Sequence, residues 1–176
     1  MSDISLPIDS GFSPIVGRYP RFLILGSMPG NKSLSKQQYY AHPRNAFWPI
    51  MATLFNFDHT LDYASRCAVL SQSDVAVWDV LKSCHRPGSL DANIDSDTLI
   101  INDFKTFLQQ HSSISVLFFN GAKAESIFKQ VLPTLTEAQR SAISMRRLPS
   151  SSPAHAAMTF EQKLTSWRKA FSCALD

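Results

Sequence analysis

The sequence predicts an α/β fold, a three-layer α/β/α sandwich around a central, four-stranded and mostly parallel sheet. Three short apolar runs, RFLILG at 21–26, VAVWDV at 75–80 and SVLFFNG at 115–121, are rich in β-branched and aromatic residues and stop at polar residues or glycine. Such runs are typical of buried strands. Segments with helical spacing separate them, and this alternation favours a parallel sheet with helices on both faces.

The remaining elements follow from weaker patterns. SMRRLPS at 144–150 is a fourth candidate strand. Helices are expected at roughly 46–56, 97–110, 121–131 and 159–174. In the last of these, apolar and aromatic side chains recur at helical spacing, at Phe160, Leu164, Trp167 and Phe171.

Length and composition favour one soluble domain. The 176 residues are the usual size of a single domain. Residues 1–20 contain three prolines and are expected to form an N-terminal arm, and residues 21–176 to form the domain. No run approaches the roughly 18 apolar residues that span a bilayer, and the first residues lack the order of a signal peptide. We therefore expect a cytoplasmic protein without a membrane partner, associated with the nucleoid if bacterial.

Cysteines and charges limit the function classes. The three cysteines are far apart and have no CxxC spacing, so neither a disulfide framework nor a zinc site is indicated. No cluster of His and Asp suggests a metal, and we expect no cofactor. The net charge of +3 is too small to predict a nucleic-acid partner by itself. Basic residues gather in 140–176, which fits either an acidic partner or a solvated helix face.

The segments after the predicted strands carry the chemistry. In open α/β sheets, ligands bind outside the carboxyl ends of the strands. The four segments found there are polar and rich in glycine or proline: SMPGNKSLSKQQYYAHPRNAFW, LKSCHRPGSLDAN, the Asn120-Gly121 pair and LPSSSPAHA. GSMPG at 26–30 is neither a Walker A loop nor GxGxxG, which argues against ATP and dinucleotides. Its glycines also fit a purely structural turn.

Taken in order, GSMPGxxSL, QYYAHPRNAFW, WDVLxSCxRPGSLD, FNGxKA and LPSSSPA resemble the hypoxanthine-DNA glycosylase branch of the uracil-DNA glycosylase superfamily. The resemblance runs from about residue 21 to 170. Mismatch-specific uracil and thymine glycosylases are similar too, through a GINPG-type turn, a PxNxFW block and a loop with SSS. The resemblance implies a monomeric DNA glycosylase that acts on double-stranded DNA containing a deaminated base. No lysine is obviously poised as a Schiff-base nucleophile, so we expect a monofunctional enzyme.

The resemblance also implies a catalytic residue, Asn45, which would orient a water molecule toward the sugar. Where related branches carry a water-positioning asparagine, or an acidic or Gln-Asp pair, this chain has Ser27 and Met28. Neither side chain can activate water, which favours hypoxanthine over uracil. The plainer alternative is that Asn45 caps the following helix.

A flipped base would stack on Phe47, with Tyr40 as the second wall, and present its edge to Asn120. An amide suits this edge because it offers both a donor and an acceptor. Backbone N–H groups of the 26–30 turn would stabilise the departing base. The expected base-binding set is Phe47, Tyr40, Asn120, Gly26, Ser27 and Met28. Asn120 could instead cap a helix.

The LPSSSPAHA loop would enter the minor groove, with its serines on phosphate and Pro153 to His155 filling the gap left by the flipped base. His85 and Arg86 could contact phosphate or the base. The expected DNA-binding set is Ser150, Ser151, Ser152, Pro153, Ala154, His155, His85 and Arg86. The plainer alternative is that this loop only leads into the helix at 159–174. Asp79 has no second carboxylate at a fixed spacing nearby, which gives paired-acid chemistry little support.

Three other functions stay open at this point. One is removal of uracil from mismatches, since SSS loops and PxNxFW occur in that branch too. Another is a non-catalytic module that binds damaged or single-stranded DNA, for which aromatic and basic residues would suffice. A third is a small-nucleotide hydrolase, which would not need the loop at 150–155.

Overall fold

The computed structural model describes residues 8–175, and its centre is a parallel sheet of four strands. The strand order is β3-β2-β6-β7, and each neighbouring pair is parallel. The strands are β2 (Phe22–Gly26), β3 (Val75–Asp79), β6 (Val116–Asn120) and β7 (Ser144–Leu148). All four strands predicted from the sequence are therefore confirmed.

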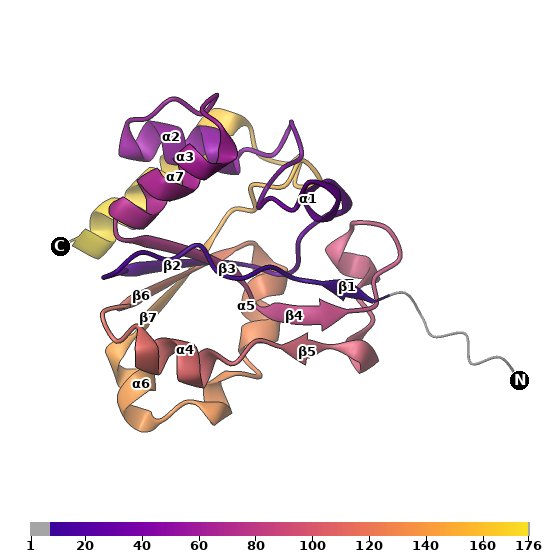
Figure 1. Cartoon of the computed structure of the whole chain (residues 1–176), viewed down its shortest axis with the longest axis vertical. Coiled ribbons are helices and arrows are strands. Elements are labelled where there is room, and N and C mark those ends of the chain that lie inside the picture. The colour runs from indigo at the N-terminus through magenta and orange to yellow at the C-terminus, as the bar shows by residue number, and fades with distance from the viewer. Residues whose placement is uncertain (1–7, 176) are drawn as a thin grey trace, which may run out of the picture.

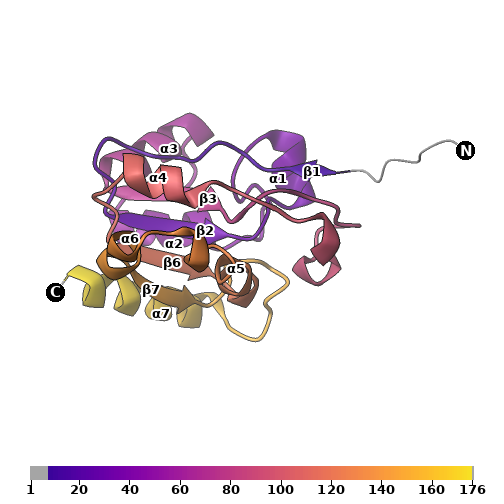
Figure 2. The same ribbon diagram turned by 90° about the horizontal axis from the view of Figure 1, so that it is seen from below.

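Helices cover both faces of this sheet, so the predicted three-layer sandwich is confirmed (Figures 1 and 2). One face carries α2 (Phe47–Phe55), α3 (Tyr63–Gln72) and α7 (Phe160–Leu175). The other face carries α4 (Phe104–Gln110), α5 (Ala122–Phe128) and α6 (Glu137–Ala142). The short helix α1 (Asn31–Lys36) follows the turn after β2.

Aromatic side chains fill the space between the layers. On one face of the sheet, Phe118 packs against Phe171 of α7 with ring centroids 4.5 Å apart, and against Phe22 at 5.9 Å. On the other face, Trp78 packs against Phe104 of α4 at 5.1 Å. Both faces of the central strands are thus buried, which is why these strands are continuously apolar in sequence.

The helix predicted at 97–110 is wrong in its first half. The segment begins with a 3₁₀ turn, Ser96–Thr98, and continues as strand β5 (Ile100–Ile101) before α4 starts. Asp103 sets this start, because its carboxylate accepts a hydrogen bond from the Thr106 N–H as an N-cap.

A second, smaller sheet was not predicted. It has the order β1-β4-β5, with β1 (Asp9–Ser10) and β4 (Leu81–Cys84) pairing antiparallel. The helices α1, α3 and α6 and the 3₁₀ turns Asp91–Asn93 and Leu132–Thr134 were also not predicted. These elements are short or weakly patterned, and tertiary contacts stabilise them.

The predicted arm at 1–20 lies partly outside the described residues, since the description begins at residue 8. From there β1 pairs with β4, and Ile15 and Val77 exchange two backbone hydrogen bonds of 2.8 and 2.9 Å. The Phe12 ring meets Tyr39 edge to face, with centroids 5.2 Å apart. Residues 8–20 therefore reach the edge of the main sheet and the smaller sheet.

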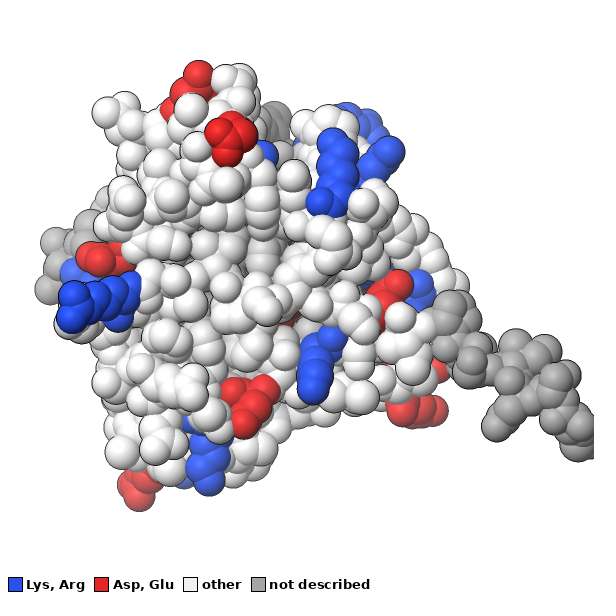
Figure 3. Space-filling model, in the orientation of Figure 1, with Lys and Arg blue, Asp and Glu red and all other residues white. Residues whose placement is uncertain are grey.

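Several basic residues of 140–176 form hydrogen bonds or ion pairs with other groups of the protein. The Arg146 guanidinium donates hydrogen bonds to the carbonyls of Ala170 and Cys173 in the last turns of α7, where the helix dipole favours a cation. Arg147 forms an ion pair with Glu125 at 3.4 Å. On the face in Figure 3, Lys and Arg side chains lie in separate groups and not in one continuous patch. Within residues 8–175, no helix is both long and apolar enough to cross a membrane.

We expect Phe118→Ala to lower the free energy of unfolding by about 3–5 kcal/mol, because it leaves a cavity between β6 and α7. Phe160→Ala removes the same side chain from a site that is 39% exposed, and should cost less than about 0.5 kcal/mol. Urea unfolding of both variants measures the two losses. Equal losses would contradict the packing described here.

Candidate active site

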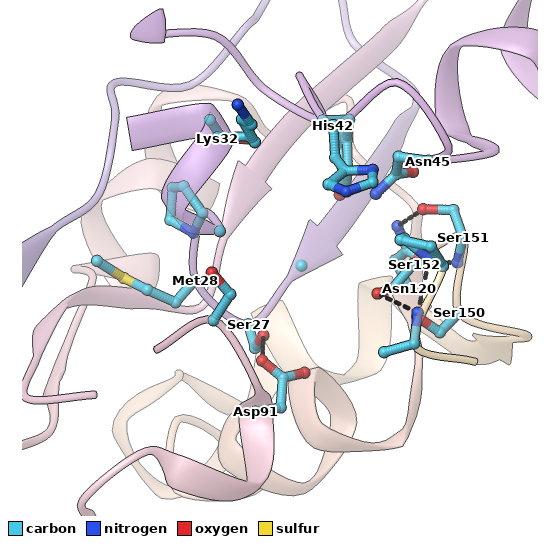
Figure 4. Close-up of a pocket in the computed structure, with 18 of the residues that line it drawn as sticks. Ser27, Met28, Lys32, His42, Asn45, Asp91, Asn120, Ser150, Ser151 and Ser152 are labelled. Atoms are coloured by element: carbon cyan, nitrogen blue, oxygen red, sulfur yellow. Dashed lines mark hydrogen bonds between the residues drawn. The ribbon is translucent and has the colours of Figure 1, made fainter. Parts of the chain in front are cut away.

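The parallel register brings the ends of all four strands to one edge of the sheet. Gly26 at the end of β2 is level with Asp79 at the end of β3, and Asn120 at the end of β6 is level with Leu148 of β7. A cavity of about 620 Å³ opens at this edge, a size that is usual for ligand sites. Its walls come from the segments that follow these strands (Figure 4).

The turn at 26–30 is held from behind by Arg86, whose side chain is only 1% exposed. Its guanidinium donates to the carbonyls of Met28 and Pro29 and forms an ion pair with Asp9 at 3.0 Å. Arg86 therefore fixes the backbone of the turn and does not reach DNA phosphate, unlike the expectation from sequence. His85 is half-buried and does not line the cavity; its backbone N–H donates to the Thr98 hydroxyl.

Gly26 is required by close contacts in the cavity floor. A Cβ atom at this position would lie 2.4 Å from Asp79 Oδ1 and 3.2 Å from the Tyr40 hydroxyl. The first distance is shorter than any non-bonded contact allows, so only glycine leaves room for both side chains.

The Asn45 side chain is anchored at the start of α2. Its Oδ1 accepts a hydrogen bond of 3.0 Å from the Phe47 N–H, while Ala46 is the N-cap residue of the helix. Asn45 is half-buried and lines the cavity. His42, whose Nδ1 accepts from the Arg44 N–H, lines the same side, across the cavity from Ser27 in Figure 4. The amide thus faces the cavity with its Nδ2 and one oxygen lone pair unused by the helix.

The aromatic wall is Tyr40 and not Phe47. Phe47 is fully buried and does not line the cavity, so the prediction that a base stacks on it is wrong. Tyr40 lines the cavity and stacks on Phe47, with centroids 3.9 Å apart and an interplanar angle of 21°. Its φ of 54° is in the left-handed region, which is strained for a residue with a side chain. Phe47 therefore acts as a backing that fixes the Tyr40 ring.

Asn120 lines the cavity and is bonded to the loop at 150–155. Its Nδ2 donates to Ser151 Oγ and its Oδ1 accepts from the Ser151 N–H, both at 2.8 Å. The Ser151 carbonyl in turn accepts from the Ala46 N–H at 2.9 Å. One N–H and one lone pair of the Asn120 amide are not used by Ser151, and the Tyr40 hydroxyl lies close enough to interact with this amide. Ser151 is 1% exposed, so its expected contact with phosphate is not compatible with this position.

The other residues of the loop form the rim of the cavity. The hydroxyls of Ser150 and Ser152 accept hydrogen bonds from the N–H groups of Ser152 and Ala154, both at 3.2 Å. Lys163 donates to the Ser152 carbonyl at 3.2 Å, and this links the loop to α7. Pro153, Ala154 and His155 complete the rim. These bonds hold the loop in a defined position beside the cavity.

Two carboxylates line the cavity, where the sequence indicated only one. Asp91 accepts a hydrogen bond of 2.6 Å from Ser27 Oγ (Figure 4). Asp79 is 3% exposed, and its Oδ2 has no hydrogen-bond partner in the described structure. Burial first, and then the charge of Asp91, raise the pKa of Asp79 to about 7, while Arg86 opposes this shift. No fixed sequence spacing joins the two carboxylates, and the fold brings both to one cavity.

Met28 and Lys32 complete the wall near α1. In Figure 4 the Met28 side chain points away from Asn45 and Asn120. Its sulfur lies toward Gly11, where an added Cβ would be 3.9 Å away. Met28 thus offers its backbone to the cavity. Within residues 8–175, no group of three or more His, Cys, Asp or Glu residues is placed to hold a metal ion.

Comparison with known proteins places this geometry in a family. A sequence model described as the uracil DNA glycosylase superfamily matches residues 15–175. The chain belongs to this superfamily. It is by this membership a DNA glycosylase, and the resemblance found in the sequence motifs is confirmed.

Individual relatives agree with the family. The chain is 34% identical over 115 residues to a hypoxanthine DNA glycosylase of Methanosarcina barkeri, covering 65% of this chain and 72% of the relative. It is 33% identical over 118 residues to a hypoxanthine DNA glycosylase of Methanosarcina acetivorans, covering 66% and 73%. A solution NMR structure of a candidate uracil DNA glycosylase from the latter organism is 28% identical, with a TM-score of 0.79 over 97% of this chain and all of that one.

The raised pKa of Asp79 predicts a pH-dependent stability. The folded pKa of about 7 exceeds the ordinary value of 3.8, so folding is favoured by this group at low pH and disfavoured as the pH rises through 7. Asp79→Asn keeps the shape and stays neutral. We therefore expect it to gain stability relative to the wild type between pH 5.5 and 8.5.

Urea unfolding at both pH values measures this gain. Asp97→Asn makes the same change at an exposed carboxylate, and its difference from the wild type should be the same at both pH values. A gain that is independent of pH for Asp79→Asn would show that its carboxyl group is ionised throughout.

Proposed function

We propose that this protein is a monofunctional DNA glycosylase that removes hypoxanthine from deoxyinosine in base excision repair, acting as a monomer on double-stranded DNA. The observation that carries the proposal is the Asn45 amide, held by the Phe47 N–H at the wall of the cavity. The turn at 26–30 brings no water-activating side chain to the cavity, because Ser27 is bonded to Asp91 and Met28 points away. The two curated relatives named above, both hypoxanthine DNA glycosylases, support this substrate.

In this proposal Asn45 orients the attacking water. A carboxamide does not titrate, so it cannot remove a proton, but its remaining N–H and lone pair can fix a water molecule facing the sugar C1′. A water held in this position has far less freedom to lose than one from bulk solvent. The water oxygen bonds to C1′, and the electron pair of the N-glycosidic bond leaves with the base.

The base would lie against the Tyr40 ring and present its edge to Asn120. Hypoxanthine has a C=O next to a ring N–H, which matches the one N–H and one lone pair that Asn120 has left after bonding to Ser151. The backbone of Gly26, Ser27 and Met28 forms the floor beneath the base. Their N–H groups would stabilise negative charge on the departing base.

The loop at 150–155 would contact the DNA around the flipped nucleotide. Extracting a base from the stack costs a few kcal/mol, and least when the base is mispaired. Ser150 and Ser152 would bind phosphate, and Pro153 to His155 would occupy the gap in the duplex. Ser151 instead carries the loop, through its bonds to Asn120 and Ala46.

We expect Asn45→Ala to slow removal of hypoxanthine by at least about 100-fold, since the water loses its orientation. Purified protein is incubated with a duplex carrying one deoxyinosine, and abasic sites are cleaved with alkali. Gln109→Ala removes an exposed amide from α4, on the opposite face of the sheet, and should retain the wild-type rate.

A parallel duplex with one deoxyuridine opposite guanine tests the substrate. Cleavage at deoxyuridine alone would keep the superfamily and replace the proposed substrate with uracil. DNA binding without cleavage of either duplex would favour a non-catalytic module. Activity on nucleotides, but on neither duplex, would favour a small-nucleotide hydrolase.

We also expect borohydride to trap no covalent complex with deoxyinosine DNA, because water is the proposed nucleophile. Lys32 is the residue to check, since it lies on the rim of the cavity and an amine there could form a Schiff base. Gel electrophoresis of the reduced mixture measures trapping. A trapped band that disappears in Lys32→Ala would replace water with this lysine.

A further inference from the structure

Asp79 has no role in the mechanism proposed above, although it lies in the floor of the cavity. It ends β3 at the level of Gly26, and its Oδ1 occupies the space that a Cβ of residue 26 would need. Its Oδ2 is buried without a hydrogen-bond partner in the described structure. Buried carboxylate oxygens are almost always hydrogen-bonded, so an unpaired one that lines a cavity indicates a missing ligand.

The hydroxyl of Tyr40 lies near the same point. It is buried, it is close to Gly26 as Asp79 Oδ1 is, and the Asn120 amide interacts with it. Asp79, with its unpaired Oδ2, therefore lines the same cavity as the ring against which the base is proposed to stack. A base with polar ring atoms would supply the partner that Oδ2 lacks.

The groups around Asp79 decide its protonation. Asp91 faces it from the 3₁₀ turn at Asp91–Asn93, Arg86 from the segment after β4, and Tyr39 and Tyr40 from the loop before α2. Burial and the Asp91 charge outweigh Arg86, and the pKa of Asp79 rises to about 7. Arg86 forms an ion pair with Asp9 and donates to the turn carbonyls, so part of its charge is offset by Asp9.

The two carboxylates differ in their surroundings. Asp91 accepts a hydrogen bond from the Ser27 hydroxyl. Asp79 has no such donor and is buried, and its raised pKa keeps part of it protonated near neutral pH. A carboxyl group with a raised pKa in a cavity has the properties of a general acid.

We propose that Asp79 is the general acid of this site and protonates a ring nitrogen of the departing purine. This inference rests on the proposed removal of hypoxanthine, a purine with ring nitrogens that accept a proton. The O–H bond of the Asp79 carboxyl group breaks and its proton bonds to the purine. The electron pair of the glycosidic bond moves into the base, and water adds to C1′. The surplus proton of that water passes to solvent, from which Asp79 is reprotonated.

The acid role explains how the bond is cleaved although the turn at 26–30 brings no water-activating side chain. Proton transfer from Asp79 neutralises the negative charge that develops on the departing base, beyond what the N–H groups of the turn stabilise. A water that is only oriented, and not deprotonated, then suffices as the nucleophile. Uracil offers no basic ring nitrogen, and its departure would gain less from the same acid. Asp79 therefore favours purines.

Single-turnover rates on deoxyinosine duplex between pH 5 and 9 test the proposal. The wild-type rate should fall with a midpoint near pH 7, as Asp79 loses its proton. Asp79→Asn should be about 100-fold slower at pH 6 and lack this step, because an amide has no proton to transfer. Any cleavage of deoxyuridine duplex should be less affected. An equal loss at every pH, with the step retained, would show a structural role and overturn the proposal.

Asp91→Asn provides a second test that does not depend on Asp79→Asn folding. Without the Asp91 charge, the pKa of Asp79 should drop and the midpoint of the wild-type profile should move to lower pH. An unchanged midpoint would overturn the proposal. If the wild type does not cleave deoxyinosine at all, the proposed function fails instead, so the two failures are distinguishable.

Discussion

The parallel pairing of β2 with β3 and β6 is the constraint on which the site depends. Parallel strands end at the same edge of a sheet, so three residues far apart in sequence, Gly26, Asp79 and Asn120, are brought to one floor. Each occupies the last position of its strand, where the backbone is fixed by ladder hydrogen bonds on the strand side and free to turn on the other. The sheet thus places a close-approach glycine, a carboxyl group and an amide without any loop having to do so.

The walls of the cavity are loops, which lack the ladder hydrogen bonds of the sheet. Buried polar contacts hold these loops in place. Arg86 satisfies carbonyls of the turn after β2, and Ser151 satisfies both ends of the Asn120 amide. In each case a backbone segment without regular structure gains partners for groups that would otherwise be buried and unpaired. This explains why a sequence so rich in glycine, proline and serine can form a defined cavity.

The sequence predicted the sheet well because burial on both faces produces continuous apolar runs, as in FLILG and VAVWD. It did not predict β4, since Lys82 and Ser83 interrupt the pattern and pairing with β1 and β5 stabilises it. The family motifs located the cavity. They could not decide which ring faces it, because Tyr40 and Phe47 both lie in one aromatic segment and only packing shows that the first covers the second.

The polar partners were the hardest to predict. Asp91 is twelve residues after Asp79, with a strand and a loop between them, and no spacing rule joins them. Arginine is a residue type that often binds phosphate, and only the burial of Arg86 shows that it binds the protein backbone instead. Motif reading identifies residues that matter at a site, but the direction of each side chain depends on contacts between distant segments.

The hydrogen bond from the Ala46 N–H to the Ser151 carbonyl joins the rim to the start of α2, directly after Asn45. Any displacement of the loop at 150–155 is therefore transmitted through one peptide unit to the amide of Asn45. In the proposed mechanism, DNA binding and catalysis are therefore coupled. A DNA strand that binds the loop correctly leaves Asn45 positioned to orient the water toward C1′, and a strand that binds incorrectly displaces it. Fidelity then comes from alignment as well as from affinity.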